Sequence, residues 1–95
     1  MPRSHKKARS TEAQQYRMSA LVEISGVSRD MIKYYLRAGL LPQPRKPRPN
    51  LSLYSDNHLL LIRLIQRVQQ QTSLSLPDIA EAFRAADYDP TTIEI

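Results

Sequence analysis

Hydrophobic residues recur at helical spacing from about residue 16 onward, whereas residues 1–15 are polar and basic without a period. We therefore interpret 1–15 as a disordered basic arm and expect the ordered domain to begin near Tyr16. A first short helix is predicted with Ser19 as its cap and Leu21 on its apolar face. This helix should end at Gly26, because glycine readily adopts the left-handed conformation that a sharp turn requires.

A second helix is predicted directly after this turn. Val27 should tuck its side chain under the turn, and Ser28 should cap the new helix. Asp30 in the first turn suits the positive end of the helix dipole. The helix runs to about Ala38, and Gly39 ends it. Two short helices joined by a three- or four-residue turn with a glycine form the helix-turn-helix pattern.

The two adjacent tyrosines of the second helix are expected to face opposite sides. At about 100° per residue, Tyr35 falls on the apolar face together with Ile32. Tyr34 falls on the other face, where Lys33 and Arg37 flank it. The pattern therefore predicts that Tyr35 packs in the core and that Tyr34 lies on a cationic surface.

A proline-rich segment separates the second helix from the third. Four prolines within residues 42–49 exclude a helix and favour an extended loop. Leu51–Tyr54 alternates apolar and polar residues, as a short strand does, and we expect it to pair with Leu40–Leu41 as a hairpin. A basic loop on such a hairpin is a wing, and a proline-stiffened linker is the alternative. The cations interleaved with the prolines are Arg45, Lys46 and Arg48.

The remaining pattern predicts two further helices. The third begins at Ser55 or Asp56 and is apolar enough to be the central core helix. Its core face should carry Leu61, Ile65 and Val68, with Leu60 and Leu64 beside it. The fourth has Ser75 as its cap and Pro77 in its first turn. The residues expected to face the core from it are Ile79, Ala82 and Phe83.

The predicted fold class is mainly α, a winged helix-turn-helix with four short helices and a small two-stranded β wing. We place this domain at residues 16–86 and interpret 87–95 as a tail or as the start of a further helix. Four helices and a hairpin in 95 residues leave room for one small core.

Charge is concentrated in the first half of the chain. The formal net charge is +5. Residues 1–50 hold 11 basic and 3 acidic residues, a balance of +8, while residues 51–95 hold 3 basic and 6 acidic residues, a balance of −3. This asymmetry favours a polyanion as partner. Charge alone leaves open a soluble basic protein without such a partner, and the arm at 1–15 either contacts nucleic acid or only aids solubility.

Several other functions find little support in the sequence. The chain has no cysteine, and its two histidines, His5 and His58, lie far apart, so we expect no disulfide and no metal site. Paired carboxylates, a nucleophile with its base and a phosphate-cradling glycine loop are missing, so we expect neither an enzyme nor a cofactor. No apolar run reaches the roughly 18–20 residues of a membrane span, so we expect a cytoplasmic, soluble protein.

The motif "GVSRDMIKYYLRAGLLPQPR" at 26–45, followed by "LYS", "IRLIQRVQQ" and "SLPDI", resembles the DNA-binding domain of the MerR family of bacterial transcription regulators. This resemblance implies a winged helix with its second helix in the major groove, its wing on the flanking backbone and double-stranded DNA as partner. The usual member dimerises through a long helix after the fourth one. Two alternatives follow for this chain. Either it belongs to a longer regulator that forms a homodimer through sequence beyond residue 95, or it is a minimal protein that dimerises otherwise or not at all. The effector is unknown.

The resemblance also indicates which residues face DNA. From the second helix these are Arg29, Asp30, Lys33, Tyr34 and Arg37, and from the wing Arg45. We add Lys46, Arg48 and the helix amides near Ser28 as phosphate contacts. Arg29 and Asp30 are the candidates for reading base edges.

Two departures from the family pattern bear on recognition. Asp30 stands where the family usually has an arginine, and an acidic side chain there can accept a hydrogen bond from cytosine. Leu51–Tyr54 stands where the wing strand usually reads Tyr-Arg-x-Tyr, so that Lys46 or Arg48 would have to replace the missing arginine. We expect Tyr54 itself to belong to the core at the base of the wing.

Three function classes remain open. The first is sequence-specific DNA binding that regulates bacterial transcription. The second is a related winged-helix protein, excisionase-like or chromosome-anchoring, that bends or marks DNA. The third is a protein-interaction module whose basic face meets an acidic partner.

Overall fold

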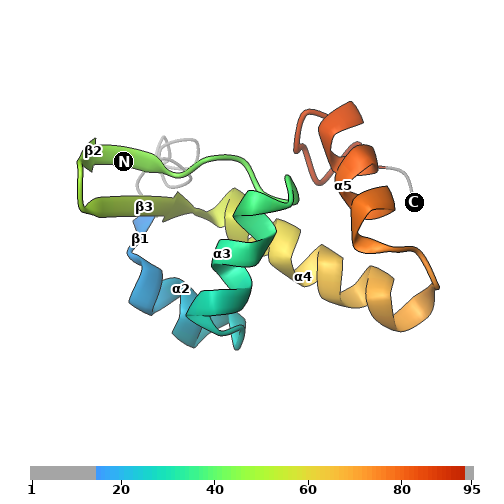
Figure 1. Cartoon of the computed structure of the whole chain (residues 1–95), viewed down its shortest axis with the longest axis horizontal. Helices are drawn as coiled ribbons and strands as arrows, with labels where there is room; N and C mark the ends of the chain where they lie inside the picture. The colour runs from blue at the N-terminus through green and yellow to red at the C-terminus, as the bar shows by residue number, and fades with distance from the viewer. Residues whose placement is uncertain (1–14, 94–95) are drawn as a thin grey trace, which may run out of the picture.

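Four helices and a small antiparallel sheet make up the part of the chain that the computed structural model describes, residues 15–93 (Figure 1). The predicted winged helix-turn-helix class is confirmed. The predicted arm lies outside the described residues except for Gln15, which already belongs to a strand. In chain order the elements are β1 Gln15–Tyr16, α2 Met18–Ser25, α3 Arg29–Arg37, β2 Arg45–Arg48, β3 Leu51–Ser55, α4 Asp56–Gln71 and α5 Leu76–Ala85.

The helix-turn-helix unit follows the predicted local signals. Gly26 has φ of 75°, and its amide bonds to the carbonyl of Val22, which closes α2. The Ser28 hydroxyl accepts the amide of Met31 at 3.1 Å and so caps α3. The expectation that Ser19 caps the first helix was wrong. The helix begins at Met18 and has no side-chain cap, because the pairing of β1 with β3 brings the chain into the helix two residues earlier.

The sheet differs from the predicted hairpin. β3 lies in the centre and pairs antiparallel with β1 on one side and β2 on the other. The strand opposite β3 is the basic segment Arg45–Arg48, with a register irregularity between its two paired ends, and not Leu40–Leu41. Both leucines are fully buried, whereas neighbouring side chains of a strand point to opposite faces. Pro47 is tolerated in β2 because this strand is an edge of the sheet.

The core is built around α4, which runs between the helix-turn-helix unit and α5 (Figure 1). The predicted core positions of α4 are buried, and Ile62 is buried in addition. Leu60, which we placed beside the core face, is 51% exposed. On α5 the buried small residue is Ala80, and Ala82 is only half-buried. Because α4 has partners on two sides, its buried surface is wider than the single stripe that periodicity indicates.

Two further findings hold for residues 15–93. None of the helices in this range is long and apolar enough to cross a membrane. Over the same residues, no group of three or more histidine and carboxylate side chains is placed to hold a metal ion.

His58 joins α4 to the segment that precedes the wing. It is 5% exposed, and its ring meets that of Tyr54 edge-on at 5.1 Å between centroids. Its Nδ1 accepts the amide of Ser55 at 3.1 Å, and its Nε2 lies 2.9 Å from the carbonyl oxygen of Pro42. Since a carbonyl only accepts, this arrangement requires the neutral ring with its proton on Nε2. Burial lowers the pKa of His58 below its ordinary value.

We therefore expect stability to fall as the pH is lowered from 7.5 to 5. The His58 pKa is about 6.5 in the unfolded chain and lower in the folded one, so that only the unfolded state gains a proton just below pH 6.5. The contribution of His58 is fully present above that pH and is lost as the pH falls toward the folded pKa. Urea denaturation at several pH values measures it, with His58→Gln as the control. The same pH dependence in both proteins would contradict this assignment.

Candidate nucleic-acid interface

The nine side chains predicted to meet DNA are all exposed, and they lie on α3, at its N-cap and on the wing strand β2. Tyr34 is 41% exposed while Tyr35 is 4% exposed, although their ring centroids are only 6.4 Å apart. The predicted division of the two tyrosines is thus confirmed. The nine residues are Ser28, Arg29, Asp30, Lys33, Tyr34, Arg37, Arg45, Lys46 and Arg48.

The structure divides the start of α3 into two sides. Asp30, Met31 and Tyr34 line a shallow hollow of about 350 Å³ on the outward side, together with Ser28 at the cap. Arg29 faces the other way, toward α2 and the wing. Met31 is 43% exposed and was missed by the sequence reasoning. Its position three residues before Tyr34 was the available signal, because residues at this spacing are neighbours on a helix.

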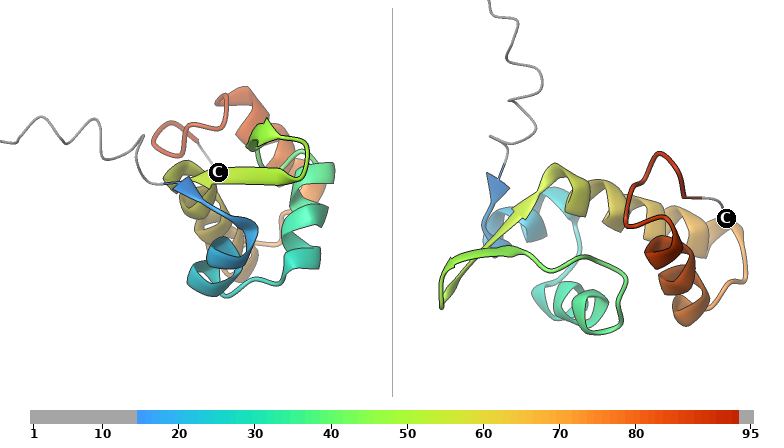
Figure 2. Two further views of the ribbon diagram at one scale, coloured as in Figure 1. Left: turned by 90° about the vertical axis from the view of Figure 1, so that its left-hand side faces the viewer. Right: turned by 90° about the horizontal axis from the view of Figure 1, so that it is seen from above.

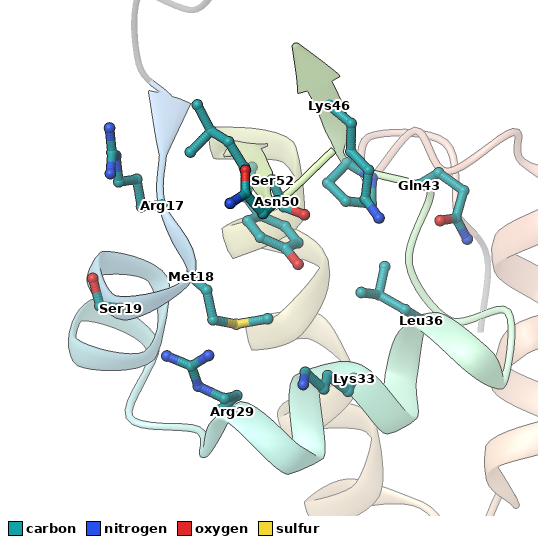
Figure 3. Close-up of a pocket in the computed structure, with 13 residues that line it drawn as sticks. Arg17, Met18, Ser19, Arg29, Lys33, Leu36, Gln43, Lys46, Asn50 and Ser52 are labelled. Atoms are coloured by element: carbon teal, nitrogen blue, oxygen red, sulfur yellow. The ribbon is translucent and has the colours of Figure 1, made fainter. Parts of the chain in front are cut away.

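A groove of about 430 Å³ lies between the start of α2, α3 and the wing (Figure 3). Arg29 and Lys33 border it from α3, Lys46 from β2 and Arg17 from the chain entering α2. None of the residues that line it is acidic. Four cations that share a concave site without a carboxylate create a positive potential that attracts an anion.

The floor of the groove is apolar with one phenol. Met18, Leu36 and Leu51 contribute aliphatic side chains, and Tyr54 lies beneath them at the base of the wing. Burial raises the pKa of Tyr54, and its hydrogen bond with Ser52 and the charge of Arg29 oppose this rise only in part. The phenol therefore stays protonated at neutral pH. The expectation that Tyr54 is a core residue of the wing base is confirmed by its exposure of 2%.

Only three of the nine predicted residues border this groove, namely Arg29, Lys33 and Lys46. Arg45 lies outside it and donates to the side chain of Gln15 at 3.5 Å. The sequence reasoning missed Arg17 together with the polar side chains Ser19, Gln43, Asn50 and Ser52. Arg17 could not be found from the sequence, because the strand that places it beside the wing, β1, is only two residues long and shows no hydrophobic alternation.

Comparison with known proteins assigns the family. The family model described as "MerR HTH family regulatory protein" matches residues 16–86, which include both helices of the helix-turn-helix unit, the wing, α4 and α5. The chain belongs to the MerR family. The resemblance inferred from the sequence motifs is thereby confirmed.

Curated MerR-family relatives share this part of the chain. The mercuric resistance operon regulatory protein of Serratia marcescens is 31% identical over 70 residues, 74% of this chain and 48% of that protein. The protein of the same name from Bacillus cereus is 28% identical over 74 residues, 78% of this chain and 55% of that protein. The chain thus spans about half the length of these curated relatives. No solved structure gave a significant match.

The wing strand of this MerR-family member departs from the usual pattern where it borders the groove. Leu51 and Ser52, where the family commonly has a tyrosine and an arginine, border the groove. Of the two cations expected to replace that arginine, Lys46 borders the groove and Arg48 does not. Lys46 therefore supplies the positive charge of the wing at this site.

Proposed function

We propose that this chain is the part of a bacterial transcription regulator that binds double-stranded DNA in a sequence-specific way, with α3 in the major groove and the wing along the flanking backbone. The observation that carries the proposal is the cationic groove beside the exposed face of α3, in a chain of the MerR family. A major groove about 12 Å wide accepts one α-helix, and α3 exposes its outward face along its whole length.

The two sides of α3 have different roles in this proposal. The outward hollow meets the base edges, with the carboxylate of Asp30 as acceptor for cytosine N4 and the thioether of Met31 against a thymine methyl group. The Tyr34 hydroxyl donates to a phosphate at the rim. Arg29, which the sequence places among the base readers, contacts the backbone instead, because its side chain borders the groove.

The groove receives a phosphate of the DNA backbone. Arg17, Arg29, Lys33 and Lys46 neutralise its charge, and the sugar packs on the apolar floor. Positions outside the groove add further contacts along the strand. These are Ser28 through the α3 amides, Arg37 at the last turn of α3, and Arg45 and Arg48 on the wing.

Specific affinity of the usual order, about 10⁻⁸ M or tighter, generally requires two half-sites. We expect the isolated domain to bind one half-site weakly. A homodimer through sequence beyond residue 95 and a palindromic target both stay predictions.

Selection from a random duplex library tests the proposal. We expect enrichment of one short motif, bound about tenfold or more tightly than a scrambled duplex at low salt. Asp30→Asn should change the preferred base at one position, because an amide donates as well as accepts. Asp78→Asn, in the first turn of α5, is the matched control and should preserve the motif.

Two outcomes would contradict the proposal. Tight binding without any enriched motif would indicate a protein that bends or marks DNA. Binding to acidic proteins without DNA affinity at low salt would indicate a protein-interaction module.

A further inference from the structure

Residues 38–44 connect the two parts of the proposed DNA surface, since they join the end of α3 to the first strand of the wing. Gly39 reverses the chain with φ of 80°, and Leu40 and Leu41 anchor it in the core. Together with the pairing of β3, the path of this connection sets where the wing stands relative to α3. A side chain that holds the connection therefore acts on both parts of the surface.

Tyr88 holds this connection from the far end of the chain. Its hydroxyl donates to the carbonyl of Gly39 at 2.9 Å, although 49 residues separate the two. Figure 1 shows the segment after α5 returning toward the end of α3, and the right-hand view of Figure 2 shows the same approach from above. The contact therefore joins the end of the described chain to the end of the recognition helix.

The backbone of Tyr88 is itself held on two sides. Its amide donates to the carbonyl of Phe83 at 2.8 Å, and its carbonyl accepts the side-chain amide of Asn57 at 2.9 Å. Asp87 and Tyr88 both have positive φ, 55° and 58°, a conformation unfavourable for residues with a Cβ atom. Such a conformation persists only where surrounding contacts maintain it. These contacts fix the backbone of Tyr88 and so hold its hydroxyl in place beside the carbonyl of Gly39.

A second bond holds the other end of the same connection. The Nε2 of His58 lies 2.9 Å from the carbonyl oxygen of Pro42. His58 and Asn57 are neighbours in the first turn of α4. His58 holds Pro42 directly and Asn57 holds Tyr88, so both ends of the connection are anchored to the same helix. Gly39 is also closely approached, because a Cβ atom there would stand 2.7 Å from the guanidinium of Arg84 on α5.

We propose that Tyr88 is a positioning residue for DNA binding, which fixes the orientation of the wing relative to α3 through its bond to the Gly39 carbonyl. The inference rests on the proposed DNA-binding function and adds to it a residue that touches no DNA. Without the hydroxyl, the connection loses one of its two side-chain bonds to the backbone, and the wing cations meet the phosphates in a wider range of orientations.

The test compares Tyr88→Phe with Thr72→Val in the 95-residue chain. Both substitutions remove one hydroxyl that donates to a main-chain carbonyl, at 2.9 Å and 2.8 Å, with little change of shape. The Thr72 hydroxyl donates to Val68 and accepts the amide of Leu74 at 3.2 Å, all at the end of α4, and serves as the control. Amide hydrogen exchange of Leu40, whose amide bonds to Tyr35, should become about three- to tenfold faster in Tyr88→Phe and stay unchanged in Thr72→Val.

DNA binding supplies the second measurement. Tyr88→Phe should weaken binding about three- to tenfold at a temperature where both variants are fully folded, and Thr72→Val should not. Lys46→Ala should cost less affinity in the Tyr88→Phe background than in the unaltered chain, because the wing is then already displaced. A purely structural role would lower the melting temperature and leave the two substitutions additive.

The outcomes separate the two proposals. Normal DNA binding by the unaltered chain with unchanged affinity in Tyr88→Phe, or with additive effects of Tyr88→Phe and Lys46→Ala, overturns the role of Tyr88 alone. Leu40 exchange that is equal in the two variants also overturns it. Absence of DNA binding by the unaltered chain overturns the proposed function, and the role of Tyr88 with it.

Discussion

Replacing Tyr35 by alanine should lower the free energy of unfolding by about 3–5 kcal/mol, the usual cost of removing a buried aromatic side chain. Tyr34→Ala should change it by less than about 1 kcal/mol. The two residues are adjacent and identical in type, but Tyr35 is 4% exposed and Tyr34 is 41% exposed. A small domain has about 5–15 kcal/mol of stability in total, so the first substitution removes a large share of it.

Urea denaturation at pH 7.5 measures both free energies of unfolding. DNA affinity is then measured without urea, where the variants are folded, and there the substitution of Tyr34 should have the larger effect. Tyr34→Phe and Tyr34→Ala should weaken DNA binding while the domain remains folded, because the hydroxyl on the outward face is lost. An equal loss of stability in Tyr34→Ala and Tyr35→Ala, with undiminished DNA affinity of folded Tyr34→Ala, would contradict the assignment of the two faces.

Raising the salt concentration from 50 to 200 mM should weaken DNA binding about 6,000-fold. Each phosphate contact contributes about 0.9 to the slope of log affinity against log salt, so seven contacts give a slope of about −6. Five of these contacts are expected from the sequence, namely Lys33, Arg37, Arg45, Lys46 and Arg48. The groove adds Arg17 and Arg29.

Substitutions at the groove measure how much each cation contributes to this slope. Lys33→Gln combined with Lys46→Gln should reduce its magnitude by about 1.8, and Arg17→Gln by about 0.9, with similar effects on all duplex sequences. Arg67→Gln is the control, because Arg67 is exposed on α4 and does not border the groove. Equal slopes in Arg17→Gln and Arg67→Gln would exclude Arg17 from the phosphate contacts.

The features that local sequence determines are those set by neighbours within one or two turns. Gly26 ends α2 because glycine adopts the left-handed backbone conformation at that position. Ser28 caps α3 by accepting the amide of the residue three positions later. The division of Tyr34 from Tyr35 needs only the 3.6-residue period of a helix. Together with the family motif, these signals were sufficient for the fold class and for the outward face of α3.

The partner of β3 lay beyond such signals. Arg45–Arg48 has no alternation of apolar and polar residues, so Leu40–Leu41 was predicted as the strand instead. The residue pattern of one segment does not indicate which other segment supplies its hydrogen bonds. The same applies to β1, whose two residues pair with β3 and bring Arg17 to the groove.

The sequence by itself thus determined the helices, the caps of α3 and α5 and the exposed face of α3, since these depend on contacts between residues a few positions apart. Only the tertiary structure decided which cations share a groove, that Arg29 belongs to it while Asp30 faces away, and that Tyr88 bonds to Gly39. The physical reason is that strand pairing and the bond across 49 residues form only when distant segments pack on the common core around α4.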